Sequence, residues 1–464
     1  MIKGTKRLIP VLVALLLVLS LLAACGGTKT TTQTQTSIPT VTSATTSTLT
    51  TTKTSTTTSI STTTTTTTTT PPAPVRIGIL EDTSGVVAAY GNAYVEGQKV
   101  AVQMVNDAGG IKSLGGAKIE PVWGAGDSTA TAATSEVERL ISSEKVVGIS
   151  GPTATAEILA AIPLFERYKV PQIGGLSDEA QFQKGYRFIF GSTGSFQNMG
   201  KQQADFVDWL AKNHGAPMDR IAIASQLPSF AARQQGLVDE LTVLGYKDKI
   251  VMTESFAITV TDQSPLVLKI KSANPTMVIY QGVASDGVLF HKACNTYDYT
   301  PWLVMDDNSY GGTTTRDGLG TDLAKKILLR PNIFGVGNGI AGDLYERIPT
   351  LKAFKDLWTK AYPGSKSNYP TVSQGAQRLL ILVRAIDNAA SRNPEDIANA
   401  LRKVDIKSGD PYIVFGDNIG GAKMTDSGLI SAITVMAEQW KNDLSGPGVI
   451  WPASFANATP RIQK

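Results

Sequence analysis

The stretch that decides the fold starts with Val75-Arg76-Ile77-Gly78-Ile79-Leu80, a short apolar run, and continues into a segment with helical spacing. In that segment the apolar residues Ala101, Met104, Val105 and Ala108 recur at positions that share one helix face. Gly109-Gly110 then ends the pattern, as glycine commonly ends a helix. The sequence therefore predicts a buried strand followed by an amphipathic helix.

The same alternation continues along the chain. Further strands are predicted at 119–123, 146–149, 170–173 and 187–190, with helical patterns near 133–141 and 155–168. A second series has predicted strands at 221–225, 251–256, 277–280 and 302–305, separated by helices. Repeated strand–helix units predict parallel sheets covered by helices on both faces. We therefore expect an α/β fold of two doubly wound parallel-sheet lobes.

The pattern changes after Pro331. It predicts a strand at 333–336, a helix near 351–362, a long helix with an apolar face from Ala376 to Ala390, and a short helix opened by Pro394. These pieces are too few for a third domain, so we expect them to complete the first lobe, with 429–440 crossing back to the second. The predicted lobes are 75–194 with 337–430, and 195–336 with 431–464.

Composition excludes several classes of protein. The 464 residues are 42% hydrophobic and carry a net charge of +4, of which three positive charges lie in a predicted leader, so nucleic acid is not an expected partner. Two cysteines and two histidines are too few for a disulfide framework or a Cys/His zinc cluster, and we expect neither metal nor cofactor. Gly124, Gly126, Gly335, Gly337 and Gly339 do not fit a dinucleotide-binding motif and are interpreted as loop glycines.

Signatures of catalysis are also missing from the sequence. It contains no phosphate-binding loop motif, no zinc-protease motif and no G-x-S-x-G. His291 and Cys294 are close enough on a predicted helix to face each other, but no third orienting group is evident, so ordinary packing is expected. We therefore predict a binding protein and not an enzyme.

Residues 1–24 have the pattern of a secretory signal peptide. Lys3, Lys6 and Arg7 precede an apolar run from Leu8 to Leu22 that is short for a membrane-spanning helix. The following Leu-Ala-Ala-Cys-Gly-Gly resembles the bacterial lipobox, which implies cleavage before Cys25 and attachment of lipid to it. The alternative is an uncleaved anchor helix. Two or more acyl chains would hold the protein stably on the outer face of the cytoplasmic membrane, in the periplasm or at the cell surface.

Residues 25–74 contain the lipidated cysteine and a predicted disordered linker. Of the 43 residues from Thr28 to Thr70, 27 are threonine, and too few apolar side chains remain to offset the entropy of folding. Such a coil spans about 40 Å on average, so it would act as a tether. Its composition also resembles that of O-glycosylated stalks.

Polar and small residues follow the predicted strands, where open parallel sheets bind their ligands. In the first lobe, 151–155 and 174–178 offer hydroxyls and backbone N–H groups that suit a carboxylate. The alternative is that Thr155 and Ser177 serve only as helix N-caps. In the second lobe, Asp306-Asp307 follow a buried strand and suit a ligand ammonium, the alternative being solvated loop carboxylates.

Specific motifs support this interpretation. They occur in this order: Arg76-Ile77-Gly78-Ile79-Leu80, Thr83-Ser84-Gly85, Ala89-Tyr90-Gly91, Gly97, Ala101-Val102, Asn106-Asp107-Ala108-Gly109-Gly110-Ile111, Gly151-Pro152, Val170-Pro171-Gln172-Ile173, Asp262-Gln263-Ser264-Pro265, Asn274-Pro275, Gly375-Ala376 and Trp451-Pro452. Together they resemble the type I periplasmic solute-binding proteins of the branched-chain amino-acid (Leu/Ile/Val) ABC transporter family. The resemblance covers residues 75 to 452.

The resemblance implies two lobes that are joined by a three-stranded hinge and close on an amino acid or related carboxylate or amide, for delivery to a permease. Its carboxylate-binding cluster corresponds to Ala154, Thr155 and Ser177, with Gly175 and Leu176 beside it. The ammonium-binding acid corresponds to Asp306, with Asp307 as its neighbour. The side-chain pocket corresponds to Tyr90, Phe230, Val283 and Ala284.

The sequence also departs from that family at several of these positions. Gly174-Gly175 stand where a Ser-Pro pair is usual, Phe230 replaces a tyrosine, and Ala284 lies near the place of a covering aromatic residue. The solute is therefore left open. Two alternative functions are a ligand-sensing receptor of the same fold and, with less support, a cell-wall amidase or hydrolase.

Overall fold

The computed structural model describes residues 71–463, except 86, 177–178, 258, 338–342 and 432. The predicted signal peptide, Cys25 and almost all of the threonine-rich linker lie outside the described residues. Within them, no helix combines the length and the apolar character needed to cross a membrane.

The first sheet is parallel throughout. Its strands run in the order β13-β5-β4-β3-β1-β2. Their bounds are β1 Val75–Asp82, β2 Ile119–Gly126, β3 Ile149–Ser150, β4 Gln172–Gly174, β5 Ile189–Gly194 and β13 Leu429–Ile430. The predicted strand at 75–80 is thus confirmed and lies inside the sheet, where Ile77 and Ile79 are fully buried.

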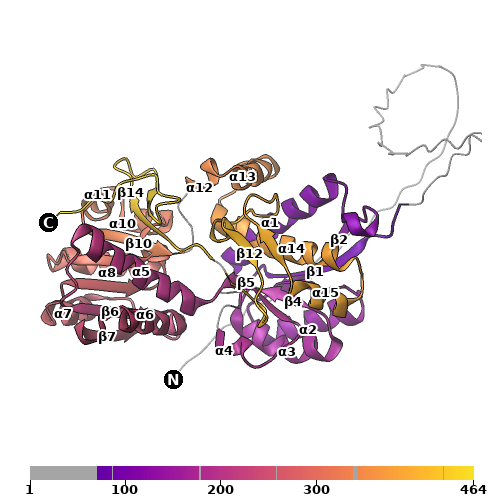
Figure 1. Cartoon of the computed structure of the whole chain (residues 1–464), viewed down its shortest axis with the longest axis horizontal. Helices are drawn as coiled ribbons and strands as arrows, with labels where there is room; N and C mark the ends of the chain where they lie inside the picture. The colour runs from indigo at the N-terminus through magenta and orange to yellow at the C-terminus, as the bar shows by residue number, and fades with distance from the viewer. Residues whose placement is uncertain are drawn as a thin grey trace, which may run out of the picture. The chain divides into compact units, whose positions relative to one another are not determined.

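Helices cover both faces of this sheet. Figure 1 shows α1 and α14 on one face and α2 and α3 on the other. The helices are α1 Ala88–Asp107, α2 Ala130–Ser142, α3 Thr155–Tyr168, α4 Glu179–Phe182, α12 Leu344–Arg347, α13 Pro349–Ala361, α14 Tyr369–Ala389 and α15 Pro394–Leu401. A small antiparallel pair, β11 Asp405–Lys407 with β12 Gly421–Lys423, follows α15.

The second sheet has the order β15-β14-β10-β9-β8-β6-β7. Its strands are β6 Ile221–Gln226, β7 Ile250–Phe256, β8 Met277–Gln281, β9 Trp302–Asp306, β10 Ile333–Gly337, β14 Met436–Trp440 and β15 Pro447–Trp451. Strands β6 to β10 pair in parallel, whereas β14 and β15 add an antiparallel edge that the strand–helix alternation did not predict. The α/β architecture with two sheets is confirmed.

The helices of the second sheet alternate with its strands. They are α5 Phe196–His214, α6 Ala231–Val243, α7 Ser264–Ser272, α8 Ala284–Thr296, α9 Asp307–Tyr310, α10 Thr313–Leu319 and α11 Thr321–Leu328. The core of this half lies between the sheet and these helices, in two clusters on its faces.

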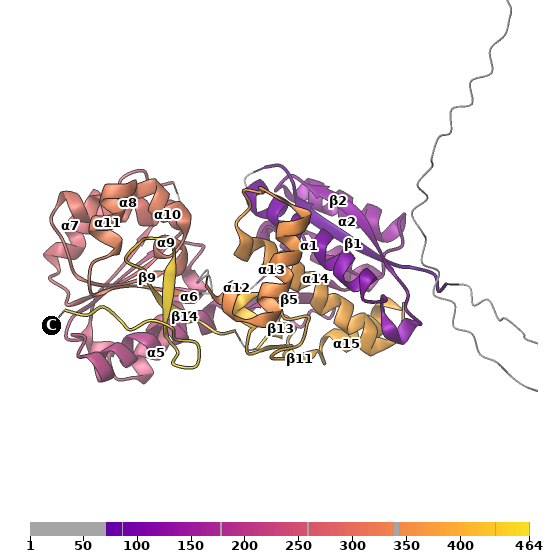
Figure 2. The same cartoon turned by 90° about the horizontal axis from the view of Figure 1, so that it is seen from above.

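The chain passes between the two sheets at three places in the described residues. Strand β5 belongs to the first sheet, and α5, which follows it, packs in a core of the second. After β10 the chain returns, since Leu344 and Tyr345 of α12 lie in the first core. Finally, β13 pairs in the first sheet and β14 in the second (Figure 2).

Two glycines bring α1 and α14 unusually close. A Cβ atom on Gly97 of α1 would lie 1.9 Å from the carbonyl oxygen of Val372, and one on Gly375 of α14 would lie 2.6 Å from Cα of Tyr94. Only glycine permits this approach without backbone movement. The contact places Tyr94 of α1 beside Arg378 of α14, which matters for the site below.

Four glycines that were interpreted as loop residues lie in strands instead. Gly124 and Gly126 belong to β2, and Gly335 and Gly337 belong to β10, while Gly339 lies outside the described residues. Packing explains Gly335, because a Cβ atom there would approach the Tyr310 ring to 2.6 Å. The loop interpretation was therefore wrong for these four.

Candidate ligand-binding site

A cleft of about 280 Å³ opens where loops at the carboxyl ends of both sheets' strands meet. This is the expected position of a ligand in open parallel sheets. Its lining residues are Tyr90, Tyr94, Thr153, Gly175, Thr193, Phe196, Phe230, Arg233, Val283, Asn368, Pro370, Thr371, Gln374 and Phe415. Both halves of the molecule therefore contribute to one concave site.

In the first half of the molecule, a buried carboxylate supports the wall of the cleft. Glu81, the residue before the last of β1, has no exposed surface and accepts hydrogen bonds from the Thr153 hydroxyl and from Nε2 of Gln98, the latter at 2.8 Å. Burial raises the pKa of Glu81, while the Arg378 charge acts in the opposite direction. The Thr153 hydroxyl is thus held in place by an acceptor behind the cleft surface.

Arg378 joins this wall from α14. Its Nη1 lies 2.9 Å from Oε1 of Glu81, and neither side chain is exposed. The guanidinium carbon lies 4.7 Å from the centroid of the Tyr94 ring, a cation–π arrangement. The hydroxyl of Tyr94 donates in turn to Oε1 of Gln374 at 2.9 Å, so Arg378 supports two lining residues without lining the cleft itself.

In the second half, the wall contains another buried ion pair. Nη1 of Arg233, on α6, contacts Oδ2 of Asp306 at the end of β9, and the side chains are 4% and 0% exposed. Nη2 of Arg233 also donates to the carbonyl oxygen of Val336 at 2.9 Å. Arg233 lines the cleft, whereas Asp306 lies behind it and neutralises its charge.

A third carboxylate fixes the loop after β8. The backbone N–H of Val283 donates to Oδ2 of Asp286 at 3.1 Å, and Nε2 of Gln226 donates to the same oxygen at 2.6 Å. Burial raises the pKa of Asp286. This arrangement holds Val283 at the cleft surface.

Four of the predicted ligand-binding residues line the cleft: Tyr90, Gly175, Phe230 and Val283. Ala154, Thr155, Leu176 and Ala284 do not. Leu176 is 1% exposed and packs in the first core, and Thr155 is the first residue of an α3 helix whose N-cap is Ala154. Thr155 is therefore not the N-cap either, and the residue of this loop that lines the cleft is Thr153.

Asp306, the acidic residue expected to bind a ligand ammonium, lies behind the cleft and not in its lining. Asp306 has no exposed surface and is paired with Arg233, so its charge is already balanced within the protein. The side chain of Asp307 and all of Ser177 lie outside the described residues.

Sequence reasoning missed the two arginines and the start of α14. The polar residues Asn368, Thr371 and Gln374 lie just before the long apolar face, and they line the cleft together with Pro370. A usable signal was present at Arg378, a charged residue set between the buried Ala376 and Leu379. A lone arginine inside an apolar face requires a buried partner.

His291 and Cys294 are both buried in α8, in agreement with packing. Burial raises the pKa of the Cys294 thiol to about 12 and lowers that of His291 to about 3. These shifts are opposite to those of a thiolate–imidazolium pair. Within the described residues, no group of three or more His, Cys, Asp or Glu side chains could hold a metal ion.

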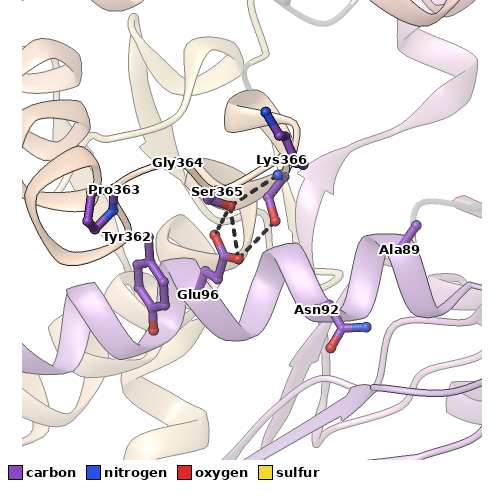
Figure 3. Close-up of a pocket in the computed structure, with 9 residues that line it drawn as sticks. Ala89, Asn92, Glu96, Tyr362, Pro363, Gly364, Ser365 and Lys366 are labelled. Atoms are coloured by element: carbon purple, nitrogen blue, oxygen red, sulfur yellow. Dashed lines mark hydrogen bonds between the residues drawn. The ribbon is translucent and has the colours of Figure 1, made fainter.

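A separate surface concavity of about 520 Å³ lies between α1 and the segment that precedes α14 (Figure 3). At its base, Glu96 accepts hydrogen bonds from Nε1 of Trp358 at 2.8 Å and from the hydroxyls of Ser365 and Ser367 at 3.0 Å. These contacts fasten the segment that leads into Asn368. We interpret Glu96 as a support for the cleft wall.

Two α/β lobes with a shared cleft at their strand ends define the class of bilobal solute-binding proteins. Residues 74–436 match a family model described as periplasmic binding protein, so the chain belongs to this extracytoplasmic family of binding proteins. Similar proteins that are named for branched-chain amino-acid binding or transport confirm the resemblance seen in the sequence.

Individual relatives agree. The chain is similar to Leu/Ile/Val-binding protein homolog 8 of Brucella abortus (strain 2308), with 27% identity over 402 residues, 84% of this chain and 94% of that protein. A putative branched-chain amino acid ABC transporter from Silicibacter pomeroyi shares the fold, with a TM-score of 0.70, 17% identity, and coverage of 84% and 99%. A solute-binding protein of an ABC transporter from R. palustris, in complex with benzoate, has a TM-score of 0.62, 17% identity, and coverage of 84% and 99%.

Proposed function

We propose that this chain captures an amino acid or related small carboxylate in the cleft and delivers it to an ABC permease. The observation that carries the proposal is the composition of the cleft: Thr153 and Gly175 from the first lobe face the same space as Phe230 and Arg233 from the second. Concave sites with aromatic walls and a few fixed polar groups suit small ligands. The names of similar proteins, which include Leu/Ile/Val binding and benzoate, support this solute class.

Binding and release follow from the two-lobed arrangement. The ligand binds first to one lobe, and contacts from the other lobe then favour closure about the three connecting segments. Phe230 and Arg233 belong to the lobe that completes the site, so their contacts with the ligand form on closure and favour the closed state. No covalent change in the ligand is required. The closed form presents both lobes to the permease.

The proposal includes a lipid anchor on Cys25 and a flexible tether up to residue 74. The lipobox-like Leu-Ala-Ala-Cys-Gly-Gly and the threonine-rich composition support it. A Cys25→Ser variant should appear in the soluble extracytoplasmic fraction, while the unmodified chain stays with the membrane. Retention of both proteins on the membrane would contradict the anchor.

Calorimetry on the full-length protein with a panel of amino acids and small carboxylates tests the central proposal. One solute should bind, and Phe230→Ala should weaken its binding about tenfold or more because the burial of a ring is lost. Leu357→Ala is the control, since Leu357 is an exposed apolar residue of α13 outside the cleft. The proposal fails if no solute in the panel binds, or if Phe230→Ala binds as tightly as the parent.

Uptake measurements separate transport from sensing and turnover. Cells lacking this chain should lose uptake of the bound solute, and the solute should leave the purified protein chemically unchanged. Undiminished uptake would indicate a receptor, and chemical conversion would indicate an amidase or hydrolase.

A further inference from the structure

Arg378 has buried hydrogen-bond donors that the protein does not use. The residue has no exposed surface, and its Nη1 is paired with Glu81, yet Nε and Nη2 have no hydrogen-bond acceptor. Arginine carries five N–H donors in a rigid fork, and a buried donor without an acceptor is costly. Arg378 can therefore still donate a hydrogen bond to an acceptor atom that does not belong to the protein.

Gly175 gives such an atom access to Arg378. A Cβ atom on Gly175 would lie 3.5 Å from Nη2 of Arg378 and 3.4 Å from the carbonyl oxygen of Thr153. Because Gly175 has no side chain and lines the cleft, this space is left for a ligand. A ligand oxygen in that space would lie within hydrogen-bonding reach of Nη2.

The nearby hydroxyl cannot replace Arg378 as the donor. Thr153 lines the same wall, but its hydroxyl proton is donated to Oε2 of Glu81. A hydroxyl has one proton to donate, so toward the cleft Thr153 can only accept. Of these two side chains, only Arg378 can therefore donate a hydrogen bond to an anionic oxygen at this wall.

The remaining charges favour a ligand without an ammonium group. Glu81 and Asp306 each pair with a buried arginine, and both lie behind the cleft surface. Among the described residues that line the cleft, none is an aspartate or a glutamate. A ligand ammonium would therefore meet arginine donors there and no carboxylate among the described lining residues.

Aromatic rings supply most of the apolar lining. They come from both lobes and from the segment after α15: Tyr90, Tyr94, Phe196, Phe230 and Phe415. Such rings stack favourably on another flat ring. The cleft volume of about 280 Å³ suits a single ring with its substituents.

We propose that the solute is an aromatic carboxylic acid, whose carboxylate lies over Gly175 and accepts a hydrogen bond from Nη2 of Arg378. This inference rests on the proposed function and names the solute class of the same cleft. Arg378 acts here as a specificity-determining residue, and the glycine at position 175 leaves no side chain between its Nη2 and the ligand.

The decisive variant is Gly175→Ala in the full-length protein. The added methyl group makes only ordinary contacts, so the fold is retained, but it occupies the place of the ligand oxygen. Benzoate should bind the parent protein, and Gly175→Ala should raise its Kd at least tenfold with an unchanged melting temperature. The matched control is Gly420→Ala, an exposed glycine outside the cleft, which should leave the Kd unchanged.

Arg378→Lys provides an independent test. Lysine keeps a positive charge beside Glu81 but has no second nitrogen in the place of Nη2. The Kd for benzoate should therefore again rise at least tenfold. An unchanged Kd for benzoate in Gly175→Ala would overturn the inference.

Leucine distinguishes a failure of the inference from a failure of the proposed function. If leucine binds the parent protein and benzoate does not, the inference is wrong while the proposed function stands. If neither these probes nor any other amino acid or small carboxylate binds, both are wrong.

Discussion

Arg378 and Glu81 form a fully buried ion pair, with Nη1 of the arginine 2.9 Å from Oε1 of the glutamate, although 297 residues separate them in sequence. Glu81 lies near the end of β1, and Arg378 lies on α14, the long helix that follows the chain's return from the second lobe. The pair therefore connects the two segments that build the first lobe. It also lies directly behind the cleft.

Removal of one partner should destabilise the protein strongly. Arg378→Met leaves Glu81 buried without its cation, so the free energy of unfolding should fall by about 3–5 kcal/mol. The double variant Glu81→Gln/Arg378→Met should recover part of this loss, because no uncompensated charge remains. Urea denaturation of the single and double variants measures both effects.

A second arginine on α14 is the matched control for that prediction. Arg384 pairs with Asp410 at 2.9 Å, but these side chains are 29% and 21% exposed. Arg384→Met should therefore cost about 1 kcal/mol or less through its ion pair. Equal losses of unfolding free energy in the Arg378 and Arg384 variants would show that burial of the Arg378–Glu81 pair does not increase the cost of removing one partner.

The close approach of α1 and α14 predicts that Gly97 cannot be enlarged. A methyl group on Gly97 would meet the carbonyl oxygen of Val372 at 1.9 Å, so the helices must separate. Gly97→Ala should lower the free energy of unfolding by at least about 2 kcal/mol. The control is Gln103→Ala on the exposed face of α1, which should be close to neutral. Equal melting temperatures for the two variants would refute the packing argument.

Local sequence patterns were sufficient for the α/β class and for most elements. The apolar run at 75–80 and the helical spacing after Ala101 are properties of contiguous residues, and they became β1 and α1. The antiparallel edge made by β14 and β15 was missed, because such strands carry no strand–helix repeat to reveal them.

The candidate site was less predictable because its walls are assembled from distant segments. The strand ends led to Gly175 and Val283, which line the cleft, but spacing along the chain could not pair Glu81 with Arg378 or place Phe415 there. Leu176 was expected at the site, yet its apolar side chain packs in the core of the first lobe. Sequence position alone does not decide which way a loop residue points.

Asp306 allows a test that separates two opposite roles. In the structure it neutralises Arg233 behind the cleft, so Asp306→Asn should lower the free energy of unfolding by about 3 kcal/mol. The same change should leave the Kd for a carboxylate unchanged or lower it, because Arg233 then has a less compensated charge. Contact of Asp306 with a ligand ammonium would instead cost about 2–5 kcal/mol of binding free energy. Calorimetry at a temperature where the variant is folded distinguishes the two roles.

A buried acid pair beneath the first wall makes stability depend on pH. Glu157 on α3 and Asp82 on β1 have no exposed surface and are close enough to share a hydrogen bond. Burial, followed by Asp82 and more weakly by Asp127, raises the pKa of Glu157 to about 8. Oε1 of Glu157 and Oδ2 of Asp82 are buried and have no other hydrogen-bond partner. When Glu157 is protonated, its carboxyl group can donate a hydrogen bond to Asp82, and this bond satisfies both oxygens.

The sign of the effect follows from the proton balance. Between about pH 4.5 and pH 8 the unfolded chain loses the Glu157 proton while the folded protein keeps it, so the free energy of unfolding falls as the pH rises. Glu157→Gln removes this pH dependence because glutamine does not titrate. Its amide N–H can donate to Asp82, and its oxygen can accept from the Ala154 N–H, as Oε2 of Glu157 does at 3.3 Å. The variant should match the parent near pH 5 and exceed it by on the order of 2–4 kcal/mol at pH 9. Urea denaturation at both pH values measures this difference, with Glu395→Gln, whose side chain is 45% exposed, as the control. Parallel pH profiles for parent and Glu157→Gln would contradict the shared proton.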